Sequence, residues 1–333
     1  MIKSFLFLLL LPMFLSCSVA VPSCGQEKIK AAIVMNDSEG PKAMAAGGLE
    51  EMLDKAGCEI KDISKVQLTD EEKRQYGAWN KEVLGSKHVG QLIAQNRKDE
   101  CLIIGLLTNC TDLLGMLAGL QHLNPGESPS APDLRNLQRK GLAGIKPLRV
   151  GLVYLDAHAD FNTPETTLSG MLGGMPVAIS AGICLTRLRL KAGLDPALPT
   201  KYIVFGGLRD VDPLEQELLD RSQCEFLTVT DIRTQSTEID RQMKRLSRLT
   251  DLVYVHVDMD VLDPAEVKGH PLTSPEGPTS SELAAAIEKM FTHPKAAAIG
   301  IASLPFGERD KDGISLRAAY LLIEGAVRGI KKR

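Results

Sequence analysis

Two short motifs bring together side chains that bind metal ions. The first, Asp156-Ala157-His158-Ala159-Asp160, contains two carboxylates and an imidazole that are separated only by alanine. The second, Asp258-Met259-Asp260, follows His256 at the same spacing of two residues. Because residues two apart point to the same side of an extended backbone, each motif should gather its polar groups on one face.

Carboxylates gathered in this way repel one another unless a cation lies between them. A divalent ion, or a pair of them, meets this need, and oxygen and imidazole ligands favour manganese among the common metals. Each motif alone also fits an ordinary explanation, the first as a solvated strand end or helix cap and the second as a phosphatase nucleophile pair. The phosphatase alternative is weakened because the threonine that usually follows such a pair is absent. Both motifs together favour a metal centre.

Apolar segments rich in β-branched residues precede both motifs and predict β-strands. Strands are expected over residues 29–35, 100–107, 150–155, 202–205, 252–257 and 297–302, with helical segments over 41–56 and 113–120 and a loop over 124–148. Near-continuous apolar strands that alternate with helices predict a single α/β domain with a parallel sheet covered on both faces. Ligands bind beyond the carboxyl ends of such strands, where both motifs lie.

The composition is that of an ordinary globular protein and argues against nucleic-acid binding. The chain has 333 residues, of which 44% are hydrophobic and 24% charged, and its net charge is −3. A nucleic-acid surface would show clustered Lys and Arg, and a base-stacking platform would need more than the 4% of aromatic residues present. The seven cysteines lack CxxC or zinc-finger spacing, so most are expected to be buried thiols.

Residues 1–20 predict export. Lys3 precedes an apolar run from Phe5 to Leu15 that is too short to span a membrane but typical of a signal peptide. Small residues at Ser18-Val19-Ala20 suit a signal-peptidase site and give a signal peptide over residues 1–20. A lipoprotein cut before Cys17, with Cys17 acylated, is the alternative. The protein is therefore expected to be periplasmic, secreted or lipid-anchored at the membrane surface.

Three stretches of the chain are similar to the ureohydrolases, the family of arginase, agmatinase and formimidoylglutamase. They are Asp156 to Pro164, Arg209 to Glu215 and Asp258 to Pro264, in the family's order and at its spacing. The resemblance spans residues 28–330 and implies a three-layer α/β/α sandwich with a parallel sheet and a two-manganese centre at the strand ends. Family members commonly form trimers or hexamers, so a homo-oligomer is implied by the resemblance alone.

The resemblance also implies a role for each polar residue of the two motifs. Residues matching Asp156 and Asp258 bridge both metal ions. The residue matching Asp160 binds one ion, and those matching His158 and Asp260 bind the other. A hydroxide that bridges the metals attacks the guanidinium carbon of the substrate and releases urea, because the metals lower the pKa of bound water.

Three further positions are implied to contact the substrate. Asn162, Ser169 and Asp212 match positions that hold the polar end of an amino-acid substrate in arginase.

The chain departs from the family pattern at the first metal motif of the family. That motif is Gly-Gly-Asp-His, and its His binds metal, whereas the corresponding stretch here is Leu107-Thr108-Asn109-Cys110. Cys110 therefore stands where a ligand is expected. Either its thiolate binds metal and favours zinc or iron, or it is a buried thiol and the first metal is weak or missing.

Two residues that handle protons and substrate in the family are also absent. Gly173 stands where arginases have a proton-shuttle His, and Ser303 stands near the Glu that pairs with the guanidinium. Our hypothesis is that His270, in the loop after the second motif, replaces the shuttle as the catalytic acid–base group. The alternative is an ordinary histidine in a surface loop. His256 is expected to lie behind the metal ligands and to hydrogen-bond there, without binding metal.

These patterns predict a metal-dependent hydrolase that cleaves a C–N bond in a small guanidino or amidino compound. Ordinary arginase activity is not expected, because a cationic substrate without a carboxylate partner is poorly held in a partly dry site. Two alternatives stay open. One is a degenerate family member that binds a ligand without hydrolysis, and the other is a hydrolase of a different non-peptide C–N substrate.

Overall fold

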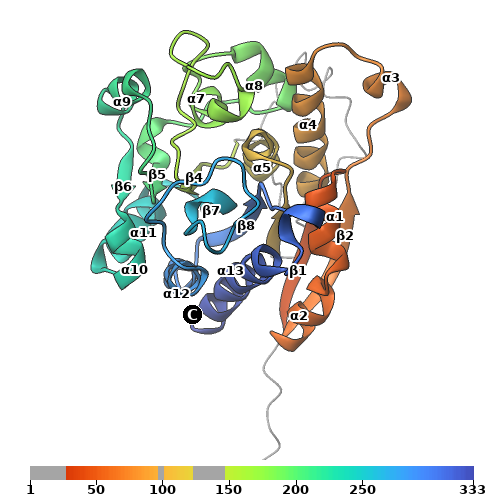
Figure 1. Cartoon of the computed structure of the whole chain (residues 1–333), viewed down its shortest axis with the longest axis vertical. Coiled ribbons are helices and arrows are strands. Elements are labelled where there is room, and N and C mark those ends of the chain that lie inside the picture. Colours follow the sequence, from red (N-terminus) through yellow and green to blue (C-terminus); the bar gives the residue numbers. More distant parts are fainter. Residues whose placement is uncertain (1–27, 97–100, 123–146) are drawn as a thin grey trace, which may run out of the picture.

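An eight-stranded parallel sheet forms the centre of the molecule. The computed structural model describes residues 28–96, 101–122 and 147–333, which Figure 1 shows as coloured ribbon. The predicted signal peptide over residues 1–20, Cys17 and nearly all of the loop expected at 124–148 lie outside the described residues. The strands follow the order β2-β1-β3-β8-β7-β4-β5-β6, and every neighbouring pair is parallel.

Six of the strands coincide with the apolar segments that predict them. They are β1 (Ile29–Met35), β3 (Leu102–Leu106), β4 (Val150–Leu155), β5 (Ile203–Gly206), β7 (Leu252–Asp258) and β8 (Ala296–Ala302). Every residue of β3, β4, β5 and β7 is buried. This agrees with a sheet that helices cover on both faces, where a strand has no solvated side and its sequence is apolar throughout.

The two strands at the edges of the sheet were not predicted from the sequence. β2 (Cys58–Lys65) is largely polar and only partly buried, and β6 (Glu225–Leu227) is three residues long. An edge strand has one neighbour and more contact with solvent, so it tolerates charged side chains and shortness that an inner strand does not.

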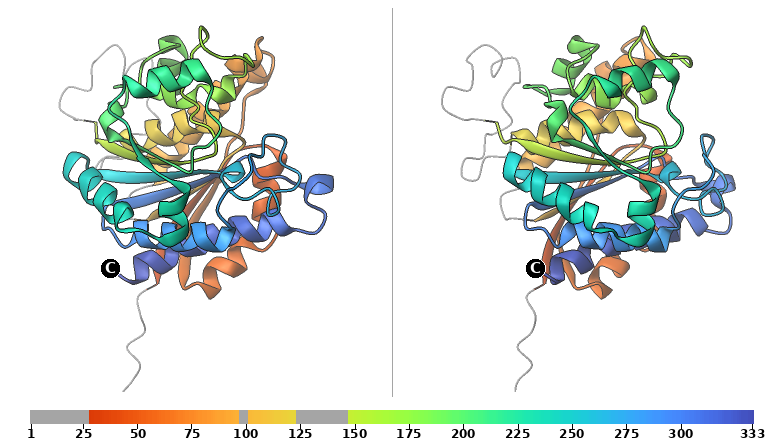
Figure 2. Two further views of the ribbon diagram at one scale, coloured as in Figure 1. Left: turned by 60° about the vertical axis from the view of Figure 1, so that its left-hand side comes forward. Right: turned by 90° about the vertical axis from the view of Figure 1, so that its left-hand side faces the viewer.

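Helices lie on both faces of the sheet and give the three-layer α/β/α sandwich that the resemblance implies (Figure 2). One buried core joins the sheet to α1 (Glu39–Ala46), α2 (Leu49–Lys55), α10 (Val229–Thr234), α11 (Thr237–Leu249), α12 (Ser280–Phe291) and α13 (Ile314–Lys331). The other joins it to α4 (Ala78–Asn96), α5 (Leu113–Gln121), α7 (Pro176–Ser180), α8 (Thr186–Ala192) and α9 (Pro213–Asp220). Neighbouring residues of an inner strand can face different cores, as do Ile33 and Val34 of β1. None of the described helices is long and apolar enough to cross a membrane.

The helical segment expected over residues 41–56 is wrong as a single helix. It is divided into α1 and α2 at Gly47-Gly48, and Gly48 has a φ of 103°. Glycine adopts this left-handed conformation without a steric penalty, so the chain turns here instead of continuing one helix.

The register of the sheet places the two acidic motifs side by side. Leu155, the last residue of β4, pairs with Val257 of β7. Asp156 and Asp258 therefore leave neighbouring strands at the same edge of the sheet. On the other side of β7, Asp258 pairs with Ala302 of β8, which brings Ser303 to the same edge.

Candidate metal centre

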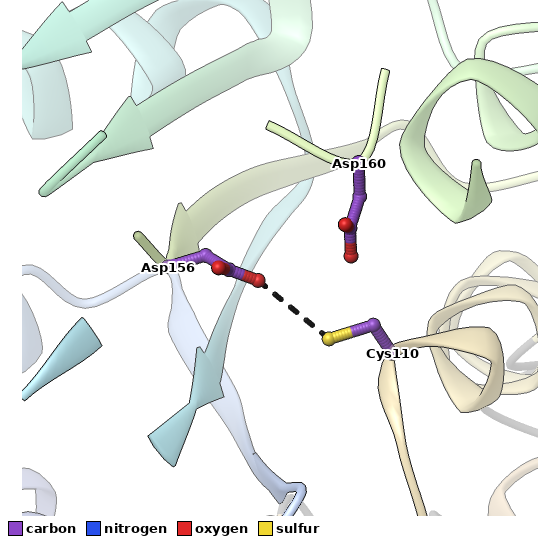
Figure 3. A group of neighbouring side chains, drawn as sticks. All are labelled: Cys110, Asp156 and Asp160. Carbon is purple, nitrogen blue, oxygen red and sulfur yellow. Dashed lines mark hydrogen bonds between the residues drawn. The ribbon is translucent and has the colours of Figure 1, made fainter. Parts of the chain in front are cut away.

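Loops after neighbouring strands converge at this edge to form a buried polar cluster. Asp156 and Asp160 follow β4, and Cys110 begins the short 3-10 helix η2 (Cys110–Asp112) after β3. Figure 3 shows the side chains of Cys110, Asp156 and Asp160 pointing toward one another. Asp258 ends β7, and Asp260 lies in the 3-10 turn η5 (Met259–Val261) that follows.

The backbone of both motifs turns instead of staying extended, so the expected alternation along a strand is not what gathers the side chains. Asp160 has a φ of 49°, in the left-handed region. The Asp156 carboxylate accepts a hydrogen bond from the His158 amide at 2.7 Å, and the Asp258 carboxylate accepts one from the Asp260 amide at 2.9 Å. Each motif thus makes the same aspartate-capped turn, because the sheet no longer supplies partners beyond the last strand residue.

The potential ligand atoms fall into two groups that share Asp156. One atom each from Cys110, Asp156 and Asp160 lie within 4.8 Å of one another, and so do one atom each from Asp156, His158 and Asp260. The two carboxylate oxygens of Asp156 face different groups: Oδ1 is 3.3 Å from His158 Nδ1, and Oδ2 is 3.7 Å from Cys110 Sγ. His158 Nδ1 is also 3.1 Å from Asp260 Oδ2.

Asp258 has a similar arrangement on the other side of the cluster. Its Oδ2 is 2.8 Å from Cys110 Sγ, and its Oδ1 is 3.7 Å from His270 Nε2. A third group of mutually close ligand atoms comprises Asp258, Asp260 and His270. The five predicted ligands of the two motifs, together with Cys110, are therefore all brought to one place.

His270 is buried beside this cluster and is not an ordinary surface histidine. Only 9% of the residue is exposed. Its Nδ1 accepts a hydrogen bond from the Leu272 amide at 3.2 Å, which assigns the proton of the neutral ring to Nε2, the atom that faces Asp258. Gly269 permits this placement, because a Cβ there would lie 2.1 Å from the Arg309 carbonyl oxygen.

The electrostatics of the cluster favour a cation. Asp156, Asp160, Asp258 and Asp260 are between 1% and 7% exposed. Burial and the neighbouring carboxylates raise the pKa of Asp156 well above its ordinary value, and burial likewise raises the pKa of Asp160. Within the described part of the chain, only histidines form ion pairs with these carboxylates, and no Lys or Arg does.

His158 carries much of the positive charge that this arrangement requires. Burial opposes its protonation, but hydrogen bonds to Asp156 and Asp260 raise the pKa of His158 to about 11. Burial also opposes ionisation of Asp260, whose pKa is nevertheless lowered by His158. Burial raises the pKa of Asp156 and Asp160, and the carboxylates in turn raise the pKa of His158. A divalent cation fits such a cluster, because it would neutralise the same oxygens directly. Oxygen, imidazole and sulfur donors are all present for it.

A layer of aromatic residues behind the cluster holds Asp160. Tyr154 donates a hydrogen bond to Asp160 Oδ2 at 2.5 Å and stacks on His256, with ring centroids 4.9 Å apart. His256 contacts Tyr254 through Nδ1 at 2.8 Å, and burial lowers the pKa of His256 to about 3, so its ring is neutral. His256 thus lies behind the ligands, as expected. Tyr154 was not among the predicted site residues, although it precedes Asp156 by only two residues.

Further polar residues tie the loops of the site together. Ser303 has a φ of 61° and donates to Asp258 Oδ2 at 2.5 Å. Arg209 donates to the carbonyl oxygens of Asp260, Leu262 and Ser274, which joins the loop after β5 to the loop after β7. Arg209 belongs to one of the motifs that carry the resemblance. The structure shows that its guanidinium binds backbone carbonyl oxygens, which the sequence did not indicate.

The three predicted substrate-binding residues are only partly brought together. Asn162 donates to Asp212 at 3.1 Å. Asp212 also forms the capping box of α9 with Glu215. Ser169 is exposed, and the hydrogen bonds found for it are to Thr167 and Met171 in its own loop.

Comparison with known protein families agrees with this geometry. A family model described as Arginase family matches residues 127–310. The chain belongs to the arginase family. The matched region contains both acidic motifs, the Arg209 motif, Gly173 and His270, whereas Cys110 lies before it.

Individual relatives agree with this assignment. An arginase from Brevibacillus brevis is 27% identical over 242 residues, which cover 69% of this chain and 72% of that protein. The crystal structure of arginase from Bacillus cereus superposes with a TM-score of 0.72 at 18% identity and covers 90% of this chain and 98% of that one. Formimidoylglutamase from Bacillus subtilis gives a TM-score of 0.63 at 18% identity, covering 92% and 88%. The structural likeness, at such identities, shows the fold.

Proposed function

We propose that this arginase-family protein is a metal-dependent hydrolase that cleaves a C–N bond in a guanidino or amidino compound. The observation that carries the proposal is the shared carboxylate of Asp156, which faces one group of ligand atoms with each of its two oxygens. Asp258 is placed in the same way between Cys110 and His270. Two carboxylates that are each shared between two groups of ligand atoms suit a pair of divalent ions. For the group that contains His158, whose donors are oxygen and nitrogen, we propose manganese.

The metal ions would be held by Asp156, Asp160, Asp258 and Asp260, with His158 and Cys110 completing the set. When bound, divalent ions polarise the substrate and lower the pKa of water, which is the chemistry that hydrolysis of a C–N bond requires. His158 is oriented for ligation through Nδ1, because its Nε2 lies 3.7 Å from Asp210 Oδ2 on the outer side.

His270 is the residue that we propose to transfer protons. Its Nε2–H faces the cluster while its Nδ1 is held by the Leu272 amide. A departing amine needs a proton, and a donor fixed at the edge of the metal centre can supply it. Among the described residues, His158 and His270 are the only histidines with a potential ligand atom in the cluster.

Ser303 bears on the choice of substrate. It contributes a hydroxyl group to Asp258 where the family has a carboxylate that pairs with a guanidinium. A cationic group would therefore lose its partner, and we propose a substrate whose reacting group is neutral or weakly basic. Asn162, Ser169 and Asp212 are proposed to contact its polar end.

The proposal is tested by metal analysis followed by a substrate panel. The purified protein is dialysed against trace divalent ions, and its metal content is measured by elemental analysis. It is then assayed for release of urea or ammonia from guanidino and amidino compounds, including arginine. We expect two equivalents of metal and turnover of at least one compound that Asp156→Asn abolishes.

A second candidate is a binding protein that retains the fold without hydrolysis. The replacement of the guanidinium-pairing acid by Ser303, together with Gly173 in place of a histidine, favours it. Metal binding with ligand-induced thermal stabilisation but no product release across the panel would support this candidate, and the absence of metal would reject the hydrolase.

A further inference from the structure

We infer that Cys110 binds metal as a thiolate and gives the two metal positions different chemical character, so that one position prefers a thiophilic ion such as zinc. The inference rests on the proposed metal centre and goes beyond it by assigning unequal ions to its two positions. Cys110 is the one sulfur donor among the described residues of the cluster, whose other donors are carboxylate oxygens and imidazole nitrogens.

The two positions can be distinguished by the atoms that face them. Asp156 Oδ2 and Asp258 Oδ2 both face Cys110 Sγ, at 3.7 Å and 2.8 Å. Asp160 completes this position with a further carboxylate. The other position has Asp156 Oδ1 and Asp260 Oδ2 around His158 Nδ1, at 3.3 Å and 3.1 Å. One position therefore offers sulfur and oxygen donors, and the other offers nitrogen and oxygen donors.

The segment around Cys110 is held in place from several directions. Asn109 caps η2 by accepting a hydrogen bond from the Thr111 amide at 2.9 Å. Asp112 accepts hydrogen bonds from the Thr108 amide and from Asn36, which follows β1, each at 2.8 Å. These hydrogen bonds fix the segment, so the Cys110 thiol points in one direction, which a metal ligand requires.

Packing from the helix layer adds to this anchoring. Ser86 of α4 donates to the Thr111 carbonyl at 3.1 Å and accepts from the Gly115 amide at 2.7 Å. The Cys110 side chain is 4% exposed, so it reaches only the cluster and the apolar residues behind it. The Cys110 thiol donates hydrogen bonds to Asp258 Oδ2 and Asp156 Oδ2, so its sulfur points toward the carboxylates that would share a metal ion with it.

Ligation by Cys110 has a defined chemical balance. The S–H bond breaks, a sulfur–metal bond forms, and the proton leaves to solvent, so no oxidant or reductant is needed. Thiolate donors favour zinc and other soft or borderline ions over manganese, whereas carboxylates and imidazole accept manganese. The Cys110 position is accordingly the one that selects zinc.

Cobalt(II) is a suitable probe, because a thiolate–cobalt bond produces a charge-transfer absorption in the near ultraviolet that oxygen and nitrogen ligands do not. The metal-free protein is titrated with cobalt(II), and bound metal is counted by elemental analysis. The variants are Cys110→Ser, Cys110→His and, as a matched control, Cys58→Ser. Cys58 is equally buried but lies at the start of the edge strand β2, away from the cluster.

We expect the absorption band and two equivalents of cobalt in the wild type and in Cys58→Ser. Cys110→Ser should lose the band and bind the second equivalent of cobalt at least about 10-fold more weakly. Removing even a hydrogen-bond partner of a metal ligand typically lowers metal affinity by about this factor. Cys110→His should bind two equivalents without the band. Cobalt binding by the wild type without the band, or unchanged affinity in Cys110→Ser, would overturn the inference while leaving the metal centre intact. A wild type that binds no metal would reject the proposed function itself.

Discussion

Tyr154 has a single buried hydroxyl group that orients Asp160, one of the proposed metal ligands. Asp160 has a left-handed backbone and would be free to rotate its carboxylate if nothing held it. Tyr154 supplies that restraint with a 2.5 Å hydrogen bond, and its ring is fixed in turn by stacking on His256. Partners of this kind set the orientation of a ligand and hence its affinity for metal.

Tyr154→Phe should lower metal affinity by about 10–100-fold, the range expected when an outer partner of a ligand is removed. The ring remains to fill the core, so the fold should persist. Tyr254→Phe is the matched control, because it removes an equally buried hydroxyl group that contacts His256 and no carboxylate ligand. Metal affinity is measured by competition with a chromophoric chelator. Equal affinities in the two variants would show that Tyr154 does not position Asp160.

His270→Ala tests the proton-transfer role. We expect turnover of whichever substrate the panel identifies to fall by about 10²–10⁴-fold, as is typical when a general acid or base is lost. Metal content should stay at the wild-type level, because all of the proposed ligands remain. His293→Ala serves as the control: His293 also lies near an aspartate, Asp240 at 3.3 Å, but outside the cluster. Unchanged turnover in His270→Ala would exclude this role.

At the scale of elements, the contact between α4 and α5 fixes the segment that carries Cys110. The two helices approach so closely that a Cβ at Gly115 would lie 1.8 Å from the Ser86 carbonyl oxygen. The Gly115 amide uses this proximity to donate to Ser86 Oγ. Because Cys110 stands directly before α5, a shift of this helix would move the thiol relative to the carboxylates on β4 and β7.

Gly115→Ala should therefore reduce the free energy of unfolding by about 1–3 kcal/mol, the usual cost of overpacking. Chemical denaturation measures this, and metal affinity should fall in the same variant because Cys110 is displaced. In Gly173→Ala the added methyl group meets open space, so stability should change by less than about 0.5 kcal/mol. Equal effects of the two substitutions would indicate that the helix contact can relax.

For the whole molecule, the proposed metal centre is expected to link metal binding to stability. Four buried carboxylates at one edge of the sheet cost stability unless they are protonated or neutralised. Since the strands on both sides of β7 end at the cluster, an ion bound there would connect segments that are far apart in sequence. Folding and metal binding should therefore be linked.

Metal should raise the melting temperature and a chelator should lower it. At a free concentration of about 100 times Kd, one bound ion adds about 2.7 kcal/mol to the free energy of unfolding. At roughly 2–4 °C for each kcal/mol, the shift amounts to several degrees. Differential scanning fluorimetry with manganese, zinc and a chelator measures it.

Asp156→Asn distinguishes this linkage from non-specific effects of metal. Burial and the neighbouring carboxylates raise the pKa of Asp156, because its charged form is unfavourable among other buried acids. Asparagine carries no charge, so the metal-free melting temperature should be equal or higher. The increase on adding metal should disappear. An increase as large as in the wild type would place the stabilising ion elsewhere.

The acidic motifs and the strands that precede them could be predicted from the amino-acid sequence. Carboxylates placed directly after an apolar strand must lie at the edge of a buried sheet, whatever the order of the strands, because burial requires the apolar segment and excludes the charges. For the same reason the six inner strands could be predicted, while the polar edge strands β2 and β6 could not.

Contacts between residues of different segments could not be predicted in this way. Cys110, Ser303 and His270 reach the cluster through strand order and loop packing, and these depend on contacts between residues far apart in the chain. No local pattern separates a histidine in a buried loop from one in a surface loop, because the two differ only in what packs over them. The division of ligand atoms between two positions likewise depends on which oxygen of Asp156 faces Cys110, and folding alone sets that direction.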